Sequence, residues 1–158
     1  MSPRAAARLE SLGFTQVYDY VAGKADWAAM GFATEGKAAE RPRAGDVARK
    51  GVPTCHLGER LGDVRQRTEA AGWNVCLLLD DNGVLLGRLR RPALAEDSDV
   101  LVERVMEEGP TTIRPNTELK GIIRRLHAKK VGTIVVTKSD GRLIGILYRQ
   151  DGDEQLEK

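Results

Sequence analysis

The sequence predicts an α+β fold in which two β-α-β-β-α units pack as a pseudo-two-fold pair, preceded by an N-terminal helix-strand-helix segment. The first observation behind this prediction is an internal repeat. Residues 74–94 match residues 132–152 at an offset of 58 without a gap, and the register extends upstream to Val47 and Val105. The second is that each copy carries a hairpin signal between two apolar runs. Self-similarity at one fixed period is typical of duplicated structural units, so both copies should fold alike.

Each unit should open with a short strand and continue with a helix. The strands are expected in PTCHL (53–57) and TTIRP (111–115). In the second unit Thr117, behind Pro115, is the expected N-cap of the helix. Residues suited to a core then recur at helical spacing. They are Leu119, Ile122, Ile123 and Leu126 in the second unit, and Leu61, Val64 and Thr68 in the first.

A β-hairpin should follow each helix. The runs Val75–Leu79 and Thr133–Thr137 are short and apolar or β-branched, which is typical of buried strands. The turns after them read DDNG and KSDG. Asn-Gly and Asp-Gly accept the positive φ angles that tight hairpins require.

A further helix is expected over SDVLVERVMEE (98–108), with Val102, Val105 and Met106 on one side. The predicted elements divide the chain into three parts, namely an N-terminal segment (1–40), a first unit (41–98) and a second unit (99–158). A single unit of about 55 residues buries little core by itself. We therefore expect the two units to pack sheet to sheet.

Composition and charge narrow the class of protein. Apolar residues make up 41% of the chain and charged residues 30%, as in a folded globular protein. The chain has no run of about 18 apolar residues and no apolar leader at its start, which predicts no membrane span and a cytoplasmic location. The net charge is only +2, and the local basic clusters Arg88–Arg91 and Ile122–Lys130 are expected to be solvated. Nucleic-acid binding is therefore not favoured.

No pattern of catalytic or metal-ligating residues is present. Cys55 and Cys76 lie in apolar settings outside any C-x-x-C pair, and they are expected to be small buried hydrophobes. Two cysteines and two histidines at these spacings fit no usual zinc site. His127, within RRLHAKK, is expected on a helix surface rather than as a general base. We therefore expect no enzyme activity, no catalytic residue and no required cofactor.

The second unit, VMEEGPTTIRPNTELKGIIRRLHAKKVGTIVVTKSDGRLIGILYRQD (105–151), resembles a cystathionine-β-synthase (CBS) domain. The first unit resembles its partner, so residues from about 46 to 153 are similar to a CBS pair, or Bateman module. Such pairs act as regulatory or sensor modules. The resemblance implies an adenosine-type ligand such as AMP, ADP, ATP or S-adenosylmethionine in the clefts between the units.

The resemblance also implies the ligand-binding residues of the second unit. Asp151 matches the aspartate that holds the two ribose hydroxyls, and a carboxylate can accept two charge-assisted hydrogen bonds from a diol. Tyr148 replaces a threonine that contacts phosphate in the family, and the fork of Arg149 is a candidate substitute for it. Backbone at two strand starts would frame the adenine. These residues are Thr111, Thr112 and Ile113, and Gly132, Thr133 and Ile134.

The first unit departs from this pattern. Arg90 and Ala93 stand where the second unit has Tyr148 and Asp151. Alanine cannot hold a diol, so no ordinary nucleotide site is expected in this cleft. The basic residues of the first unit are instead expected to supply positive charge to the neighbouring cleft, as candidate phosphate contacts. These residues are Arg88, Arg90 and Arg91.

A second interpretation remains open, because an aspartate after a strand can simply cap the next helix. The pair would then be a ligand-free module for dimerisation or protein interaction. The resemblance implies a homodimer formed through the helices around 61–71 and 119–126. With no catalytic domain fused to the pair, any regulation is expected to act on a separate effector protein.

The N-terminal segment shows another pattern. A helix is expected to begin at Ser2 and Pro3, followed by a strand at TQVYDY (15–20) and a second helix at AGKADWAAMGF (22–32) with Trp27 and Met30 as anchors. Residues 1–36 resemble the end of a rhodanese-like domain without its catalytic cysteine loop. A sulfurtransferase remnant without activity is thus a distant alternative. The remnant is expected to pack on the pair through its aromatic residues, which are Phe14, Trp27 and Phe32.

Overall fold

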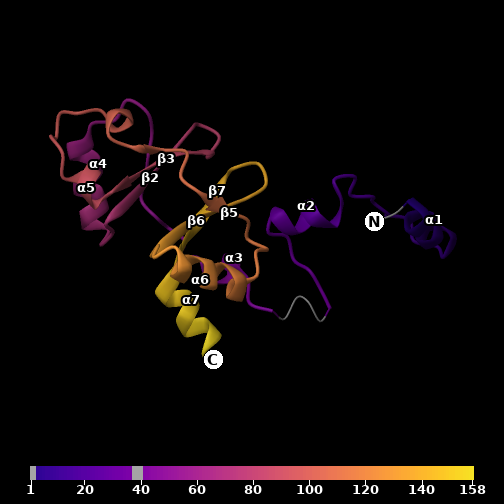
Figure 1. Ribbon diagram of the computed structural model, residues 1–158. Coiled ribbons are helices and arrows are strands. Elements are labelled where there is room, and N and C mark those ends of the chain that lie inside the picture. Colours follow the sequence, from indigo (N-terminus) through magenta and orange to yellow (C-terminus); the bar gives the residue numbers. More distant parts are fainter. Residues whose placement is uncertain (1–2, 37–40) are drawn as a thin grey trace.

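The computed structural model describes residues 3–36 and 41–158, which form two small sheets with helices packed on them (Figure 1). The first sheet has the order β1-β2-β3-β4, with bounds Thr54–Cys55, Val75–Leu79, Leu85–Arg90 and Glu107–Glu108. The second sheet has the order β5-β6-β7, with bounds Thr112–Ile113, Thr133–Thr137 and Leu143–Tyr148. The predicted mixed α+β fold built from a repeated unit is confirmed.

The helices keep the same repeat. Their bounds are Pro3–Ser11 (α1), Gly23–Ala29 (α2), Ala44–Val47 (α3), Leu61–Ala70 (α4), Arg91–Leu94 (α5), Leu119–Ala128 (α6) and Arg149–Leu156 (α7), with a 3₁₀ turn at Val102–Arg104. After a shift of 58 residues the bounds of α4 coincide with those of α6, and the bounds of β2 and β3 coincide with those of β6 and β7. The apolar patterns and turn glycines of the two copies therefore specify the same local structure.

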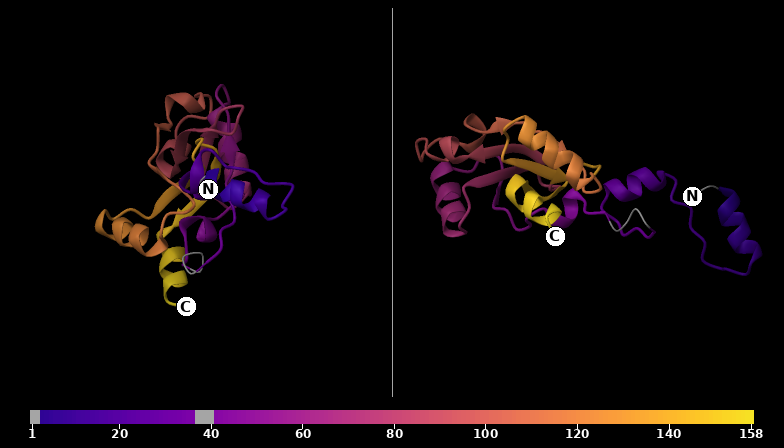
Figure 2. Two further views of the ribbon diagram at one scale, coloured as in Figure 1. Left: turned by 90° about the vertical axis from the view of Figure 1, so that its right-hand side faces the viewer. Right: turned by 60° about the horizontal axis from the view of Figure 1, so that its bottom comes forward.

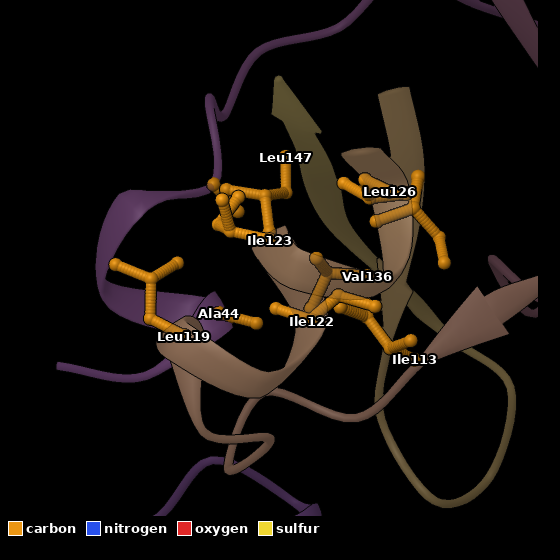
Figure 3. Packing of buried hydrophobic residues seen from close by; sticks show 10 residues of the cluster. Ala44, Ile113, Leu119, Ile122, Ile123, Leu126, Val136 and Leu147 are labelled. Atoms are coloured by element: carbon orange, nitrogen blue, oxygen red, sulfur yellow. The ribbon is translucent and has the colours of Figure 1, made fainter. Parts of the chain in front are cut away.

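Helix α6 buries the face that its spacing predicted. Its core residues, Leu119, Ile122, Ile123 and Leu126, are at most 3% exposed. They pack on Val136 and Leu147 of the sheet (Figure 3). Helix α7 lies against α6 at Gly152, where a Cβ would collide with the side chain of Ile123. Full burial of a leucine or isoleucine side chain contributes about 1.5–3 kcal/mol, so this face holds the second unit together.

The first unit repeats the arrangement. Leu61 and Val64 are fully buried against the sheet, and Thr68 satisfies its buried hydroxyl by donating to Val64 O at 2.6 Å. Cys55 and Cys76 are free, fully buried thiols in this core, as predicted. Hydrogen bonding to the neighbouring Cys76 thiol, together with burial, raises the pKa of Cys55.

The sheets of the two units face each other. Val52, Val75 and Leu77 of the first unit form one buried cluster with Val135 and Ile146 of the second. The two hairpin turns also meet, because Leu85 N–H donates to Gly141 O and Leu143 N–H donates to Gly83 O. Both turn glycines have the positive φ angles that the Asn-Gly and Asp-Gly pairs predicted, at 79° and 86°. The expected sheet-to-sheet pair is therefore present.

The segment that leads into each unit packs on the other unit. We call residues 43–50 and 101–108 the crossing segments. Ala44 of the first crossing segment lies in the core of the second unit, whereas Val102 of the other lies in the core of the first. At the centre of each crossing the segment comes close to a strand glycine. A Cβ on Gly145 would collide with Arg49 O, and a Cβ on Gly87 would lie 2.5 Å from Met106 Sδ.

Three local predictions were wrong. Residues 98–108 do not form a helix, because Val102 N–H donates to Glu59 O and the segment continues as strand β4 beside β3. Residues 15–20 do not form a strand, since no strand lies beside them in the described part of the chain and Tyr18 is 81% exposed. Thr117 does not cap α6. The helix begins after Glu118, and Leu119 N–H donates to Pro42 O instead.

The N-terminal segment forms an arm that extends away from the paired units (Figures 1 and 2). We call the described residues 3–36 the N-terminal arm. Its two predicted helices are present as α1 and α2, whereas Ser2 lies outside the described residues. The arm touches the second unit at Met30, whose sulfur accepts a hydrogen bond of 2.8 Å from Ser139. The aromatic residues expected to pack on the pair remain exposed by 38–60%. They are Phe14, Trp27 and Phe32.

Candidate functional site

Asp151 lies in the first turn of α7, directly after β7, and binds Arg49 from the first crossing segment. Arg49 Nε and Nη2 donate to Oδ2 and Oδ1, each at 2.6 Å. The Asp151 side chain is only 18% exposed, whereas that of Arg49 is 52% exposed. The guanidinium holds the pKa of Asp151 below its usual range, and the carboxylate raises the pKa of Arg49. The carboxylate is therefore ionised, oriented and reachable from solvent.

Two aromatic rings extend this ion pair. The Arg49 guanidinium lies over the Tyr148 ring, 4.4 Å from its centroid. The Tyr148 ring in turn lies 6.4 Å from that of Trp73, which comes from the first unit. Burial raises the pKa of Tyr148, so its hydroxyl stays protonated at neutral pH. We call Arg49, Trp73, Tyr148 and Asp151 the Asp151 cluster.

The predicted backbone segments meet at the same end of the second sheet. Thr133 pairs with Tyr148, and Arg149 N–H donates to Gly132 O at 2.8 Å. Strand β5 runs parallel to β6, so its start at Thr112 lies at the same end as the start of β6. The residues predicted in the second unit therefore lie at one end of the second sheet, which we call the Asp151 edge.

The predicted residues differ in what they can present at this edge. The side chains of Ile113 and Ile134 are 7% and 5% exposed and belong to the core, so only their backbone groups are available. Thr111 and Gly132 are exposed. The side chain of Arg149 has no hydrogen bond or ion pair within the described ranges 3–36 and 41–158.

At the equivalent place in the first unit, the crossing segment contributes an anion instead of a cation. Glu107 occupies the position of Arg49 in the repeat, and its carboxylate binds Arg88 at 2.9 Å and Arg90 at 2.8 Å. These arginines line a cavity of about 600 Å³ with Pro92 and Ala93. The Arg88 side chain is 10% exposed, so its charge depends on Glu107 for compensation.

The three arginines predicted as phosphate contacts therefore lie in two places. Arg88 and Arg90 belong to the cavity of the first unit, and Arg91 lines a separate hollow beside Trp73. No contact joins them to Asp151 in the part of the chain that the structure describes. Their role toward phosphate stays a prediction.

Sequence reasoning missed Arg49, Trp73 and Glu107. Arg49 is 102 residues from Asp151, and no local pattern joins them. A signal was nevertheless present in the matched glycines Gly87 and Gly145, because glycine inside a strand often marks the close approach of another backbone. Those glycines face the two crossing segments, which carry Glu107 and Arg49.

Neither a metal centre nor a membrane span accompanies this edge in residues 3–36 and 41–158. These ranges hold no group of three or more His, Cys, Asp or Glu side chains placed to bind a metal ion. No helix in them is long and apolar enough to cross a membrane. His127 is exposed at the surface of α6 and binds Asp153 of α7 at 2.9 Å, in agreement with the predicted surface position.

Comparison with known proteins gives a match to one family model and structural matches to one fold. Residues 102–151 match the family model described as the CBS domain. No curated protein sequence matches the chain. Among solved structures, the CBS domain pair of protein MJ0100 in complex with 5-methylthioadenosine and S-adenosyl-L-methionine is 15% identical. The match covers 74% of this chain and 97% of that one, with a TM-score of 0.64.

Two further solved structures give similar scores. CBSX2 in complex with AMP is 22% identical over 73% of this chain and 98% of that one, with a TM-score of 0.64. The cytosolic domain of the Mg²⁺ channel MgtE in complex with ATP is 21% identical over 75% of this chain and 51% of that one, with a TM-score of 0.65. Residues 102–151 are thus similar to a CBS domain, and the two units have the fold of a CBS domain pair.

Proposed function

We propose that this chain is a regulatory module that binds one adenosine-type nucleotide at the Asp151 edge. One observation carries the proposal, namely the ionised Asp151 carboxylate fixed beside the starts of β5 and β6. A ribose diol can donate two hydrogen bonds to such a carboxylate. The similar solved structures are complexes of other proteins with AMP, ATP or S-adenosylmethionine, which supports an adenosine ligand here.

The proposal assigns the cations of this edge to the phosphates. Arg49 would keep one nitrogen on Asp151 and turn its exposed side toward phosphate oxygens, which suits a planar guanidinium. Arg149, the candidate substitute for the threonine of the family, is the second cation proposed for the phosphates. In the first unit Ala93 offers no diol acceptor, and Glu107 already engages Arg88 and Arg90, so we propose one nucleotide for each chain.

The test is calorimetric titration with AMP, ADP, ATP and S-adenosylmethionine. We expect one of them to bind at one site per chain, and Asp151→Asn to weaken it at least tenfold. Asp153→Asn is the matched control, because this aspartate is on the same helix and binds His127 instead. Any ligand that prefers the folded state also raises stability, by about 2.7 kcal/mol at a hundredfold excess over Kd. The absence of binding at millimolar concentration would overturn the proposal.

A ligand-free interaction module is the second candidate function. The observation that favours it is that both oxygens of Asp151 already accept hydrogen bonds from Arg49, which joins a crossing segment to α7. In that case Asp151→Asn should lower the free energy of unfolding while no nucleotide changes the melting temperature. Unfolding of the variant with and without nucleotide separates the two candidates.

The remaining expectations are proposals of the same kind. A homodimer, a separate effector protein, a cytoplasmic location and the lack of enzyme activity extend the module's proposed role. The apolar side chains of α4 and α6 lie in the cores of their own units, so a dimer would use other surfaces of these helices. Light scattering of the purified chain tests the dimer. The rhodanese-like character of residues 1–36 is likewise a proposal, supported by the helices α1 and α2.

A further inference from the structure

A cavity of about 540 Å³ lies between the N-terminal arm and the second unit, away from the Asp151 cluster. We call it the arm cavity. Its walls come from the end of α2 and the residues after it, from the first crossing segment, and from the turns before α6 and after β6. The residues that matter most to its chemistry are Met30, Phe32, Lys50, Pro115, Lys138 and Ile144. Its volume lies within the range of about 300–1,000 Å³ typical of small-molecule sites.

Local structure fixes the arm over this cavity. Helix α2 ends at Ala29, and Gly31 follows shortly after it with a φ of 80°, a left-handed conformation that suits glycine at a helix end. Gly31 lies against Pro115, and Met30 accepts the hydrogen bond from Ser139. Farther along, Trp27 Nε1–H donates to Ala33 O at 2.8 Å and the Trp27 ring packs on Phe32. The arm is therefore held in place at the cavity by contacts with the second unit and by its own ring packing.

Two lysines at the arm cavity carry charges that no described residue compensates. Among the described residues that line the cavity, the cations are Arg43, Lys50 and Lys138, and the anion is Asp46. Asp46 already accepts a hydrogen bond of 2.9 Å from Arg43 N–H. The ammonium groups of Lys50 and Lys138 have no hydrogen-bond or ion-pair partner within residues 3–36 and 41–158. Two like charges at one concave surface attract a counter-ion, because a cleft concentrates their field.

The rest of the lining is largely apolar. Phe32, Pro115 and Ile144 provide a surface for a ring or an aliphatic group beside the lysines. An apolar wall with a few cationic groups matches an amphipathic anion better than a bare ion. We propose that the arm cavity binds a small organic anion that carries a phosphate or carboxylate group on an apolar body. The lysines would neutralise the anionic group, and the arm would cover the apolar part.

The site is independent of the nucleotide proposal. None of the residues that line it belongs to the Asp151 cluster or to the strand starts beside it. A ligand here would contact the arm and the second unit at once, so its binding should add to the contacts that hold the arm on this unit and change the surroundings of Phe32 and Ala33. Trp27 reports on that change, since it contacts both Phe32 and Ala33.

The experiment uses phenyl phosphate as the probe and Trp27 fluorescence as the readout. The chain has two tryptophans, so the Trp73→Phe variant leaves Trp27 as the only indole. We expect saturable binding of phenyl phosphate, with inorganic phosphate and phenol each binding at least about fivefold more weakly because each lacks one half of the ligand. Equal affinity for phenyl phosphate and phenol would overturn the proposal, as would the absence of saturable binding.

The lysines are tested one at a time. Lys50→Gln and Lys138→Gln should each weaken phenyl phosphate about fivefold, the size expected for a partly exposed ion pair. Lys120→Gln is the matched control, since Lys120 is exposed on α6 and does not line the cavity. Asp151→Asn should leave phenyl phosphate binding unchanged while weakening nucleotide binding at least tenfold, so the two proposals can fail separately. Unchanged affinity in both lysine variants, with normal melting temperatures, would refute the site.

Discussion

Arg49 and Asp151 join the crossing segment of the first unit to the last helix of the second through two parallel hydrogen bonds, each of 2.6 Å. Bidentate pairs of this kind combine charge with fixed geometry, so they specify orientation as well as adding stability. The neighbouring Tyr148 ring supports the face of the guanidinium. The pair is thus both a link between the units and the chemical centre of the candidate site.

The Arg49–Asp151 pair should make stability depend on pH in the acidic range. Arg49 lowers the pKa of Asp151 in the folded state, so an unfolded chain binds more protons between the lowered value and about 3.9. The pair's contribution is therefore fully present above about pH 5 and is lost as the pH falls through the lowered pKa. Urea unfolding followed by circular dichroism from about pH 6 to about pH 3 measures this loss.

A second carboxylate, Asp80, should also make stability fall at acidic pH, so it is needed as a control. Asp80 accepts hydrogen bonds from Val84 N–H and Asn82 N–H, and these lower its pKa. Asp151→Asn should therefore flatten the acid limb of the stability curve only in part, and Asp80→Asn should flatten it further. An unchanged acid limb in Asp151→Asn would contradict the ion pair in solution.

Removing the Arg49 charge should discriminate between nucleotide and nucleoside. In the proposed complex the guanidinium contacts phosphate, so Arg49→Met should weaken ATP about tenfold, within the range for a charge-assisted hydrogen bond. Adenosine, which has no phosphate, should change less than about twofold. Titration calorimetry of both ligands checks the ratio. Arg124→Met, at an exposed position of α6, serves as the control.

Because the first crossing segment lies against Gly145, adding one methyl group at this position should destabilise the fold. A Cβ there would collide with Arg49 O, which forces the crossing segment off β7 and strains both hydrogen bonds between Arg49 and Ile146. Overpacking of this kind costs about 1–3 kcal/mol. Gly145→Ala should therefore lower the free energy of urea unfolding by that amount.

Gly121 provides the matched control for this substitution. It lies inside α6 without a positive φ, and a Cβ added there would meet no atom within 4 Å. Alanine is the better helix former by up to about 1 kcal/mol. Gly121→Ala should thus raise stability while Gly145→Ala lowers it, and a change of the same sign in both variants would count against the crossing.

The elements that the sequence predicted well are those specified by local chemistry. Strands β2 and β6 have the predicted bounds, because apolar runs and the glycines that follow them at Gly83 and Gly141 specify strand and turn together. Residues 98–108 were misjudged for the opposite reason. Their apolar spacing suits a helix, but Val102 contacts the first core from a 3₁₀ turn, and the following backbone pairs with β3.

The candidate site, like the fold, was predictable only where local sequence specifies it. Asp151 and Tyr148 could be found because they end a repeated hairpin, whereas their partner Arg49 depends on a crossing over 102 residues of chain. The packing of the two units decides which of them a crossing segment contacts, and the repeat in the sequence does not specify this packing. Arg49 and Glu107 occupy equivalent positions of the repeat but have opposite charges. The effect of this difference depends on the folded pair, where each residue lies beside a strand of the hairpin that its segment crosses.

Glu107 should be needed for stability because it compensates a nearly buried guanidinium. Its carboxylate binds both Arg88 and Arg90, and the Arg88 side chain is only 10% exposed. Removing one partner leaves the other charge without compensation, at a cost of about 1–3 kcal/mol. Glu107→Gln should lower the free energy of urea unfolding by that amount, whereas the neighbouring exposed Glu108→Gln should stay within about 0.5 kcal/mol.

A double variant separates compensation from simple packing. If Glu107 stabilises the fold by neutralising Arg88, the cost of Glu107→Gln should shrink once Arg88 is replaced by Met, because a buried ion pair can often be exchanged for apolar groups with little loss. A coupling free energy of about 1 kcal/mol or more is expected for residues in direct contact. Strictly additive effects would show that the two side chains act separately, and the reversed charge pattern of the first unit would then have no energetic role.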